Sequence, residues 1–160
     1  MSTRIGIGYD SHRLVDGESL RMGGVDVPYD RSLDGHSDAD VLAHAVTDAL
    51  LGAAGMGDIG QHFPDTDAQW AGADSIELLA VVVSKVTAAG FAIVNVDCTL
   101  ILEAPKLGAH RDAMRARLAS ALAVNSARVN IKATTGEGMG FVGRGEGVAA
   151  LAIAALDHAD

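Results

Sequence analysis

Two histidines and one aspartate in the first third of the chain have the chemistry of a metal site. Asp10 and His12 are two residues apart in an alternating segment, so a strand there would point both side chains from one face. His44 lies where apolar residues recur at helical spacing. Two imidazoles and a carboxylate suit zinc, with a fourth position left open. The spacing also allows a structural interpretation, in which His44 is a solvated helix residue and Asp10 ends a strand.

A second group of candidates could bind an oxygen-rich anion. His36 and Ser37 precede the helical segment, and the free N–H groups at a helix N-terminus attract anions. Ser37 also has a structural interpretation as the N-cap of that helix. The segment DIGQHFPDTD adds carboxylates that bind hydroxyls or a metal ion, or simply solvate a loop. These carboxylates are Asp58, Asp65 and Asp67.

The segment TTGEGMGFVGRGEG near the C-terminus combines hydroxyls, free amides and one carboxylate, Glu137. Together with Thr134 and Thr135, Glu137 could hold a diphosphate with Mg²⁺. The segment has neither P-loop nor Rossmann spacing, and an ordinary turn region is an equal alternative. Lys106 and Arg144 are isolated cations of the kind that usually solvate a surface.

The first elements that must hold these residues follow from periodicity and turn residues. Residues 5–10 alternate like a strand, and apolar segments 20–22 and 25–27 flank two glycines, as in a hairpin. A helix is expected next, starting from an N-cap at Ser37 and ending at a glycine, 52 or 55. Its capping box would pair Ser37 with Asp40. Its polar stripe would consist of Asp40, His44 and Asp48.

The remaining elements alternate helices with strands and end in an ambiguous segment. The tail 148–156 is rich in alanine, which favours a helix, but its length equally allows a buried strand. Before it we expect a loop over 56–73, a helix from 74 to 90, a strand over 91–103, a helix after Pro105 marked by Leu107 to Leu122, a strand over 129–134 and irregular backbone over 136–147.

Length and composition indicate a single α+β domain over residues 1–160, with helices packed on one face of a mixed sheet. Hydrophobic residues make up 49% of the chain, enough for a packed core. The net charge of −9 repels nucleic acids. The single cysteine, Cys98, cannot form an intrachain disulfide, and apolar runs stay below the ~18 residues of a membrane span. We therefore expect a cytoplasmic protein that binds neither nucleic acid nor membrane.

The ordered motifs of the chain resemble those of the 2-C-methyl-D-erythritol 2,4-cyclodiphosphate synthase family. The resemblance covers nearly the whole chain. It is carried by RIGIGYDSHRL, GGVDVPYD, HSDADVLAHAVTDALLGAAGMGDIGQHFPDTD, GADS, NVDCTLILEAPKL and VNIKATTGEGMGFVGRGEG. Two positions depart from the family pattern. Gly136 stands where a third threonine is common, and Gly108 where a bulkier residue follows Leu107.

The resemblance implies roles for matching positions. Zinc would be held by Asp10, His12 and His44, and a second ion, Mg²⁺ or Mn²⁺, by Glu137. The substrate would contact His36, Ser37, Asp58, Ile59, Gly60, Phe63, Asp65, Phe141 and Arg144. The nucleotide would contact Leu102, Pro105, Lys106, Leu107, Ala133, Thr134 and Thr135. The family is a homotrimer whose three active sites lie between subunits.

The resemblance also implies a reaction. The 2-phosphate of 4-diphosphocytidyl-2-C-methyl-D-erythritol 2-phosphate attacks the β-phosphate and CMP leaves, with metal ions neutralising the charge. No side chain acts as a covalent nucleophile. A zinc hydrolase and a non-catalytic module that binds an isoprenoid diphosphate are the alternatives. In the latter, Phe141, Arg144 and Glu146 would line a central channel of the trimer.

Overall fold

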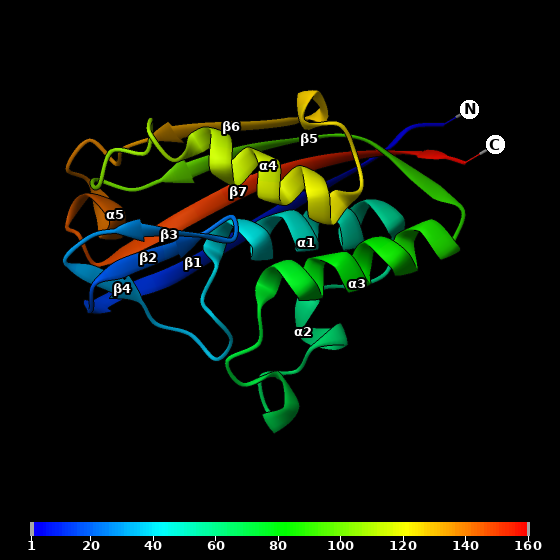
Figure 1. Cartoon of the computed structure of the whole chain (residues 1–160). Helices are drawn as coiled ribbons and strands as arrows, with labels where there is room; N and C mark the ends of the chain where they lie inside the picture. The colour runs from blue at the N-terminus through cyan, green and yellow to red at the C-terminus, as the bar shows by residue number, and fades with distance from the viewer. Residues whose placement is uncertain (1, 160) are drawn as a thin grey trace.

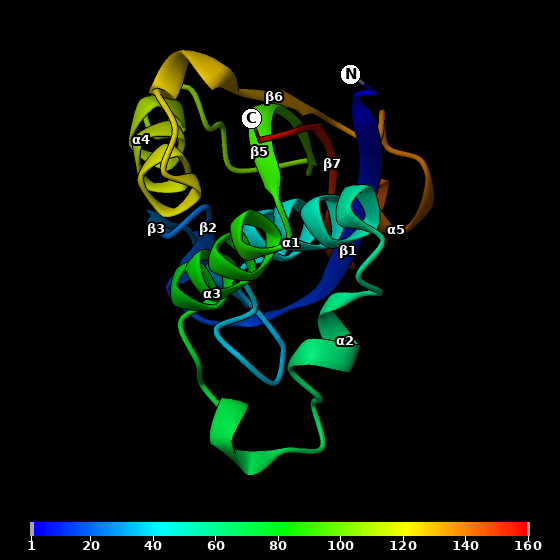
Figure 2. The ribbon, with the colours of Figure 1, turned by 90° about the vertical axis from the view of Figure 1, so that its right-hand side faces the viewer.

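The computed structural model describes residues 2–159, which form a five-stranded sheet, a separate hairpin and a layer of helices (Figures 1 and 2). The strands are β1 (Arg4–Asp16), β2 (Ser19–Met22), β3 (Val25–Pro28), β4 (Arg31–Leu33), β5 (Phe91–Ile101), β6 (Val129–Thr134) and β7 (Gly147–His158). The helices are α1 (Val41–Ala54), α2 (Ile59–His62), α3 (Ser75–Ala88), α4 (Arg111–Leu122) and α5 (Gly140–Gly143), with 3₁₀ turns at Ala68–Trp70 and Ser126–Arg128.

The main sheet is mixed, with strand order β4-β1-β7-β5-β6. Its β5 and β6 are parallel, and its other neighbouring strands are antiparallel. The alanine-rich tail is the central strand β7, which settles its ambiguity. Pairing with β1 on one side and β5 on the other satisfies its backbone on both edges, and this outweighs the helix propensity of alanine.

Two glycines in β1 let helix α1 lie directly on the sheet. A Cβ atom on Gly8 would lie 1.8 Å from the carbonyl oxygen of Ala45, and one on Gly6 would lie 2.1 Å from that of Ala49. No larger residue fits at either position without moving the helix. This close approach brings the first turns of α1 over β1, where Asp10 and His12 lie.

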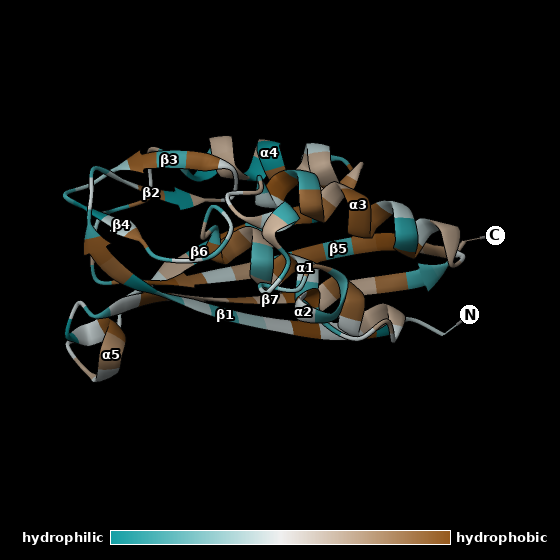
Figure 3. Ribbon diagram, turned by 90° about the horizontal axis from the view of Figure 1, so that it is seen from below, coloured by the Kyte–Doolittle hydropathy of each residue, from teal (hydrophilic) through white to brown (hydrophobic). Residues whose placement is uncertain are grey.

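The helices α1, α3 and α4 cover one face of the sheet, as expected (Figure 2). The α1 helix packs on β1 and β7, α3 packs against α1, and α4 packs against β6. Hydrophobic stretches on α3 and β5 supply much of this interior (Figure 3). Within residues 2–159, no helix is long and apolar enough to cross a membrane.

The start of α1 differs from the expectation. Ser37 is not the N-cap; the cap is Asp40, whose carboxylate accepts a hydrogen bond from the backbone N–H of Ala43. Asp40 is also fully buried rather than part of a polar stripe. Its carboxylate accepts two more hydrogen bonds, from Gly23 and Gly24 in the hairpin turn, at 2.8 and 2.7 Å. The buried charge is thus satisfied, and it ties the hairpin to the helix.

Several other element boundaries also differ from the expectation. The expected loop 56–73 contains α2 and a 3₁₀ turn, capped by the side chains of Asp58 and Asp67. The helix after Pro105 begins only at Arg111, so Leu107 is buried ahead of it. The glycine-rich segment includes the short helix α5, and the first strand extends to Asp16, where it pairs with β4.

Candidate metal centre and substrate cavity

The ligand atoms of Asp10, His12 and His44 all lie within 4.8 Å of one another. The Oδ2 atom of Asp10 is 2.7 Å from Nε2 of His12 and 3.0 Å from Nδ1 of His44. The two histidine nitrogens are 3.3 Å apart. Asp10 and His12 lie on one face of β1. Helix α1 places His44 beside them, because Gly6 and Gly8 let the helix lie close to that strand. The structure therefore supplies the convergence that spacing alone left open.

The hydrogen bonds of His12 leave one nitrogen free for a ligand bond. Its Nδ1 lies 2.8 Å from the carbonyl oxygen of Asp34, which can only accept, so Nδ1 carries a proton. Its Nε2 faces the carboxylate of Asp10 and Nδ1 of His44. Electron-rich atoms this close need a positive charge between them, from a metal ion or a proton. The donor set fits a divalent metal ion such as zinc.

The pKa values of His12 and Asp10 shift because the two side chains interact with each other. Burial by itself would lower the pKa of His12, but the hydrogen bond and charge of Asp10, the Asp34 carbonyl and the charge of Asp40 raise it overall. Burial by itself would raise the pKa of Asp10, but hydrogen bonds and charges from His12 and His44 lower it overall. In the metal-free protein, the raised pKa means that His12 holds a proton to a higher pH than a free histidine does.

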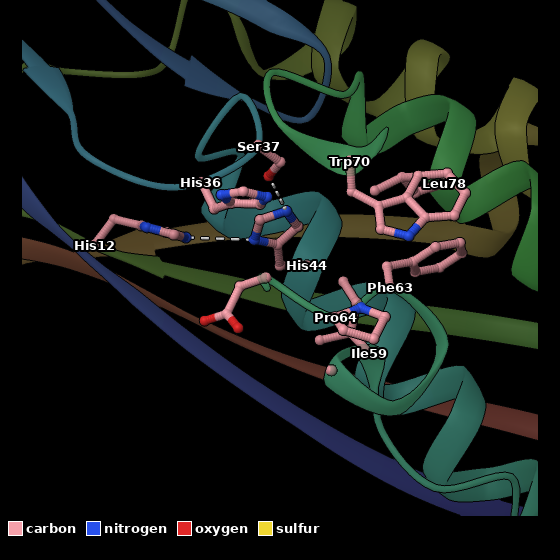
Figure 4. Close-up of a pocket in the computed structure, with 11 residues that line it drawn as sticks. His12, His36, Ser37, His44, Ile59, Phe63, Pro64, Trp70 and Leu78 are labelled. Atoms are coloured by element: carbon pink, nitrogen blue, oxygen red, sulfur yellow. Dashed lines mark hydrogen bonds between the residues drawn. The ribbon is translucent and has the colours of Figure 1, made fainter. Parts of the chain in front are cut away.

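A cavity of about 380 Å³ opens beside the two histidines (Figure 4). Its polar side carries His36 and Ser37, and its apolar side lies between α2, α3 and the loop that joins them. Six of the residues expected to bind substrate line it: His36, Ser37, Ile59, Gly60, Phe63 and Asp65. Sequence reasoning missed Pro64, Trp70 and Leu78, which also line it.

The missed Trp70 completes the apolar side by an edge-to-face contact with Phe63. Their ring centroids are 5.0 Å apart at 81°. The single tryptophan of the chain, seven residues after Phe63 in a segment expected to be a loop, was the available signal.

Asp58 does not line this cavity. Its exposed carboxylate instead accepts a hydrogen bond from the backbone N–H of Gln61 at 3.0 Å and caps α2. The cap shapes the segment that carries Ile59 and Gly60, and the substrate contact expected for Asp58 stays a prediction.

A second cavity, of about 290 Å³, lies where β5 and β6 end and the chain approaches α4. All seven residues expected to contact the nucleotide line it: Leu102, Pro105, Lys106, Leu107, Ala133, Thr134 and Thr135. Glu103, Gly108 and Arg111 line it as well. The Oε1 atom of Glu103 accepts a hydrogen bond from the backbone N–H of Gly136 at 2.5 Å, which anchors the glycine-rich segment.

Besides Asp10 and Asp58, three further expected site residues do not line either cavity: Glu137, Phe141 and Arg144. Glu137 is exposed at a positive φ of 53°, and its N–H donates to Oγ1 of Thr135. Phe141 lines a smaller cavity, of about 160 Å³, that also touches His12 and Glu146. Arg144 pairs with Glu146 at 3.3 Å.

Cys98 is not suited to nucleophilic chemistry. It is buried in β5 on the helix-covered face, and burial raises the pKa of its thiol to about 12. The expectation that no side chain serves as a covalent nucleophile is consistent with this inert thiol.

A model of one protein family matches residues 3–157 of the chain. The chain belongs to the YgbB family. A relative from Salinibacter ruber, named 2-C-methyl-D-erythritol 2,4-cyclodiphosphate synthase, is 61% identical over 98% of this chain and 99% of its own. A relative of the same name from Desulfosudis oleivorans is 58% identical over 96% of this chain and 91% of its own.

Solved structures agree with this membership of the YgbB family. A 2C-methyl-D-erythritol-2,4-cyclodiphosphate synthase in its CDP-bound form superposes with a TM-score of 0.88 at 40% identity, over 96% of this chain and 100% of that one. The bifunctional IspDF of Campylobacter jejuni superposes with a TM-score of 0.96 at 42% identity over 99% of this chain. This chain spans 43% of that longer protein.

Proposed function

We propose that this protein converts 4-diphosphocytidyl-2-C-methyl-D-erythritol 2-phosphate to 2-C-methyl-D-erythritol 2,4-cyclodiphosphate and CMP, in isoprenoid precursor biosynthesis. The 2-phosphate forms a bond to the β-phosphorus, and the bond from that phosphorus to CMP breaks. The observation that carries the proposal is the convergence of Asp10, His12 and His44 beside a cavity lined by His36 and Ser37. The identity to synthases of the YgbB family supports the same reaction.

In this proposal Asp10, His12 and His44 hold one zinc ion. The ion supplies positive charge that offsets the repulsion between the two phosphates. Ser37 and His36 donate hydrogen bonds to phosphate oxygens, while Phe63 and Trp70 exclude water on the opposite side. The residues align two parts of a single substrate, so positioning supplies much of the rate enhancement.

The nucleotide half of the site is assigned to the second cavity, where Lys106 and the backbone at Thr134 and Thr135 accept the cytidine diphosphate. The two cavities share no lining residue. A single substrate would use both cavities if they faced each other across a subunit boundary, as the resemblance to the synthase family implies. We therefore place the zinc half on one subunit and the nucleotide half on its neighbour in a homotrimer.

The face of the sheet opposite the helices supports this assembly. Neighbouring strands β1 and β7 present a row of exposed apolar side chains there, and Ile7 pairs in register with Ile153. Ile5 is 70% exposed, Ile7 67% and Tyr9 51%. A contiguous row of exposed apolar side chains marks a surface that another protein surface covers. In the trimer, the three sheets supply that cover for one another.

Further parts of the proposal rest on the resemblance of the motifs. Glu137 holds a second divalent ion, Mg²⁺ or Mn²⁺, with the diphosphate. Phe141, Arg144 and Glu146 line the central channel of the trimer, which can hold an isoprenoid diphosphate. The chain acts as a single cyclodiphosphate synthase domain over residues 1–160 in the cytoplasm.

Phosphorus NMR of the purified protein with the linear substrate, Zn²⁺ and Mg²⁺ tests the reaction. We expect the resonances of the cyclic diphosphate and of CMP to grow together. A hydrolysed linear product would instead identify a zinc hydrolase, and binding without turnover would identify a non-catalytic module. The variant His44→Ala is the control, because it should lose zinc and nearly all turnover while remaining folded.

A further inference from the structure

Nδ1 of His44 faces Asp10 and His12, and the other ring nitrogen, Nε2, lies near two hydroxyl groups. Nε2 of His44 lies 2.7 Å from Oγ of Ser75 and 3.1 Å from Oγ of Ser37. Ser75 is the first residue of α3, is 1% exposed and does not line the cavity. Ser37 is partly exposed and does line it. The two hydroxyls therefore have different access to a substrate.

The hydrogen bonds of Ser75 decide which nitrogen of His44 carries the proton. The hydroxyl of Ser75 donates its single proton to the carboxylate of Asp38. Its oxygen is then an acceptor toward His44, so the proton of the neutral ring sits on Nε2. The lone pair of the ring is consequently on Nδ1, the atom that faces Asp10 and His12. This is the form that binds a metal ion.

Asp38 is itself held in place by three elements. Its Oδ2 accepts the backbone N–H of Ser75 at 3.0 Å, and its Oδ1 accepts the backbone N–H of Asp40 at 3.2 Å. The guanidinium of Arg21, from β2, lies 3.6 Å from Oδ2. The carboxylate thus cannot turn away from Ser75 without losing these contacts. The network runs from the hairpin through the start of α3 to the ring of His44.

We propose that Ser75 is a positioning residue for the metal ligand His44, held by Asp38, and that Ser37 is free to contact the substrate. A partner that fixes the orientation and tautomer of a ligating histidine typically contributes 10- to 100-fold in metal affinity. This inference rests on the zinc site of the proposed function, but it assigns the two serines to different tasks.

The test is zinc affinity of the purified full-length protein, measured by competition with a chelator of known affinity. We expect Ser75→Ala to weaken zinc binding about 10- to 100-fold and to shift the visible absorption bands of the Co²⁺-substituted protein. Ser75→Thr retains the hydroxyl and should restore most of the affinity. The matched variant Ser37→Ala should keep the affinity within about 3-fold and raise KM for the linear substrate.

A second variant covers the case in which Ser75→Ala disturbs the start of α3. Asp38→Asn keeps the shape of the side chain, and it should weaken zinc binding while circular dichroism of the metal-free protein stays unchanged. Unchanged zinc affinity in both Ser75→Ala and Asp38→Asn, beside a wild type that binds zinc tightly, overturns this inference alone. A wild type that fails to bind zinc overturns the zinc site of the proposed function as well.

Discussion

The carboxylate of Asp48, one helical turn beyond His44, accepts a hydrogen bond from the backbone N–H of Ile59 at 2.8 Å. This contact joins α1, the helix that carries His44, to the first residue of α2. Burial, together with the charges of Asp58 and Asp10, outweighs the hydrogen bond from Ile59 and raises the pKa of Asp48. The contact holds the loop that carries Phe63 and Asp65 against the rest of the cavity.

We therefore expect Asp48→Ala to raise KM for the linear substrate about 5- to 30-fold, as the loss of one charge-assisted hydrogen bond implies. Zinc content should stay at the wild-type level, because Asp48 is not part of the group formed by Asp10, His12 and His44. Steady-state kinetics and metal analysis measure the two effects. The control is Asp30→Ala, an exposed carboxylate in the turn after β3. An unchanged KM in Asp48→Ala would contradict the role of this contact.

Zinc binding should weaken in acid because protons compete for His12. The pKa of His12 is raised above its ordinary value of 6.5, so this competition begins above pH 6.5 and grows as the pH falls. Isothermal titration at several pH values between about 8 and 5.5 measures it. An affinity independent of pH across this range would rule out His12 as a ligand.

The metal-free protein should show the opposite dependence. The interactions that raise the pKa of His12 stabilise the fold fully below pH 6.5. This stabilisation is lost as the pH rises through the higher pKa that His12 has in the folded protein. The interactions that lower the pKa of Asp10 stabilise the fold fully above pH 3.8. This stabilisation is lost as the pH falls through the lower pKa that Asp10 has in the folded protein. Thermal unfolding of the zinc-free protein should therefore gain most from the pair between these two values. The variant Asp10→Asn should flatten this dependence.

Shared active sites predict complementation between inactive subunits. His44→Ala damages only the zinc half, and Lys106→Ala damages only the nucleotide half. After subunit exchange at equal concentrations, about one quarter of the sites would combine two intact halves, and activity should return to about that fraction of wild type. Light scattering establishes the trimer independently. Mixed trimers that never regain activity would disprove shared sites, and a monomer would disprove the assembly.

Glu137 should act through the second divalent ion. We expect Glu137→Gln to lower turnover and to shift the Mg²⁺ or Mn²⁺ dependence to higher concentrations, because an amide binds these ions more weakly than a carboxylate. Zinc content should not change, since Glu137 is not part of the histidine cluster. Activity assays across a metal titration measure the effect, and a wild-type metal dependence in the variant would refute the role.

Much of the fold followed from local patterns in the sequence. The hairpin around Gly23 and Gly24, the cap of α3 at Asp74 and the strand at residues 129–134 lie where periodicity and turn residues predicted them. These features depend on neighbours within a few residues, which a sequence displays directly. The ordered motifs likewise indicated the family and the candidate metal ligands Asp10, His12 and His44 before any geometry was known.

Tertiary structure decided what depends on contacts between distant segments. Asp40 rather than Ser37 caps α1, because its carboxylate also satisfies the N–H groups of Gly23 and Gly24. The alanine-rich tail is a strand because β1 and β5 flank it on both edges. Ser75 reaches His44 only because α3 begins beside α1, some thirty residues along the chain. No local pattern encodes these contacts, because they form only when packing buries polar groups that must then be hydrogen-bonded.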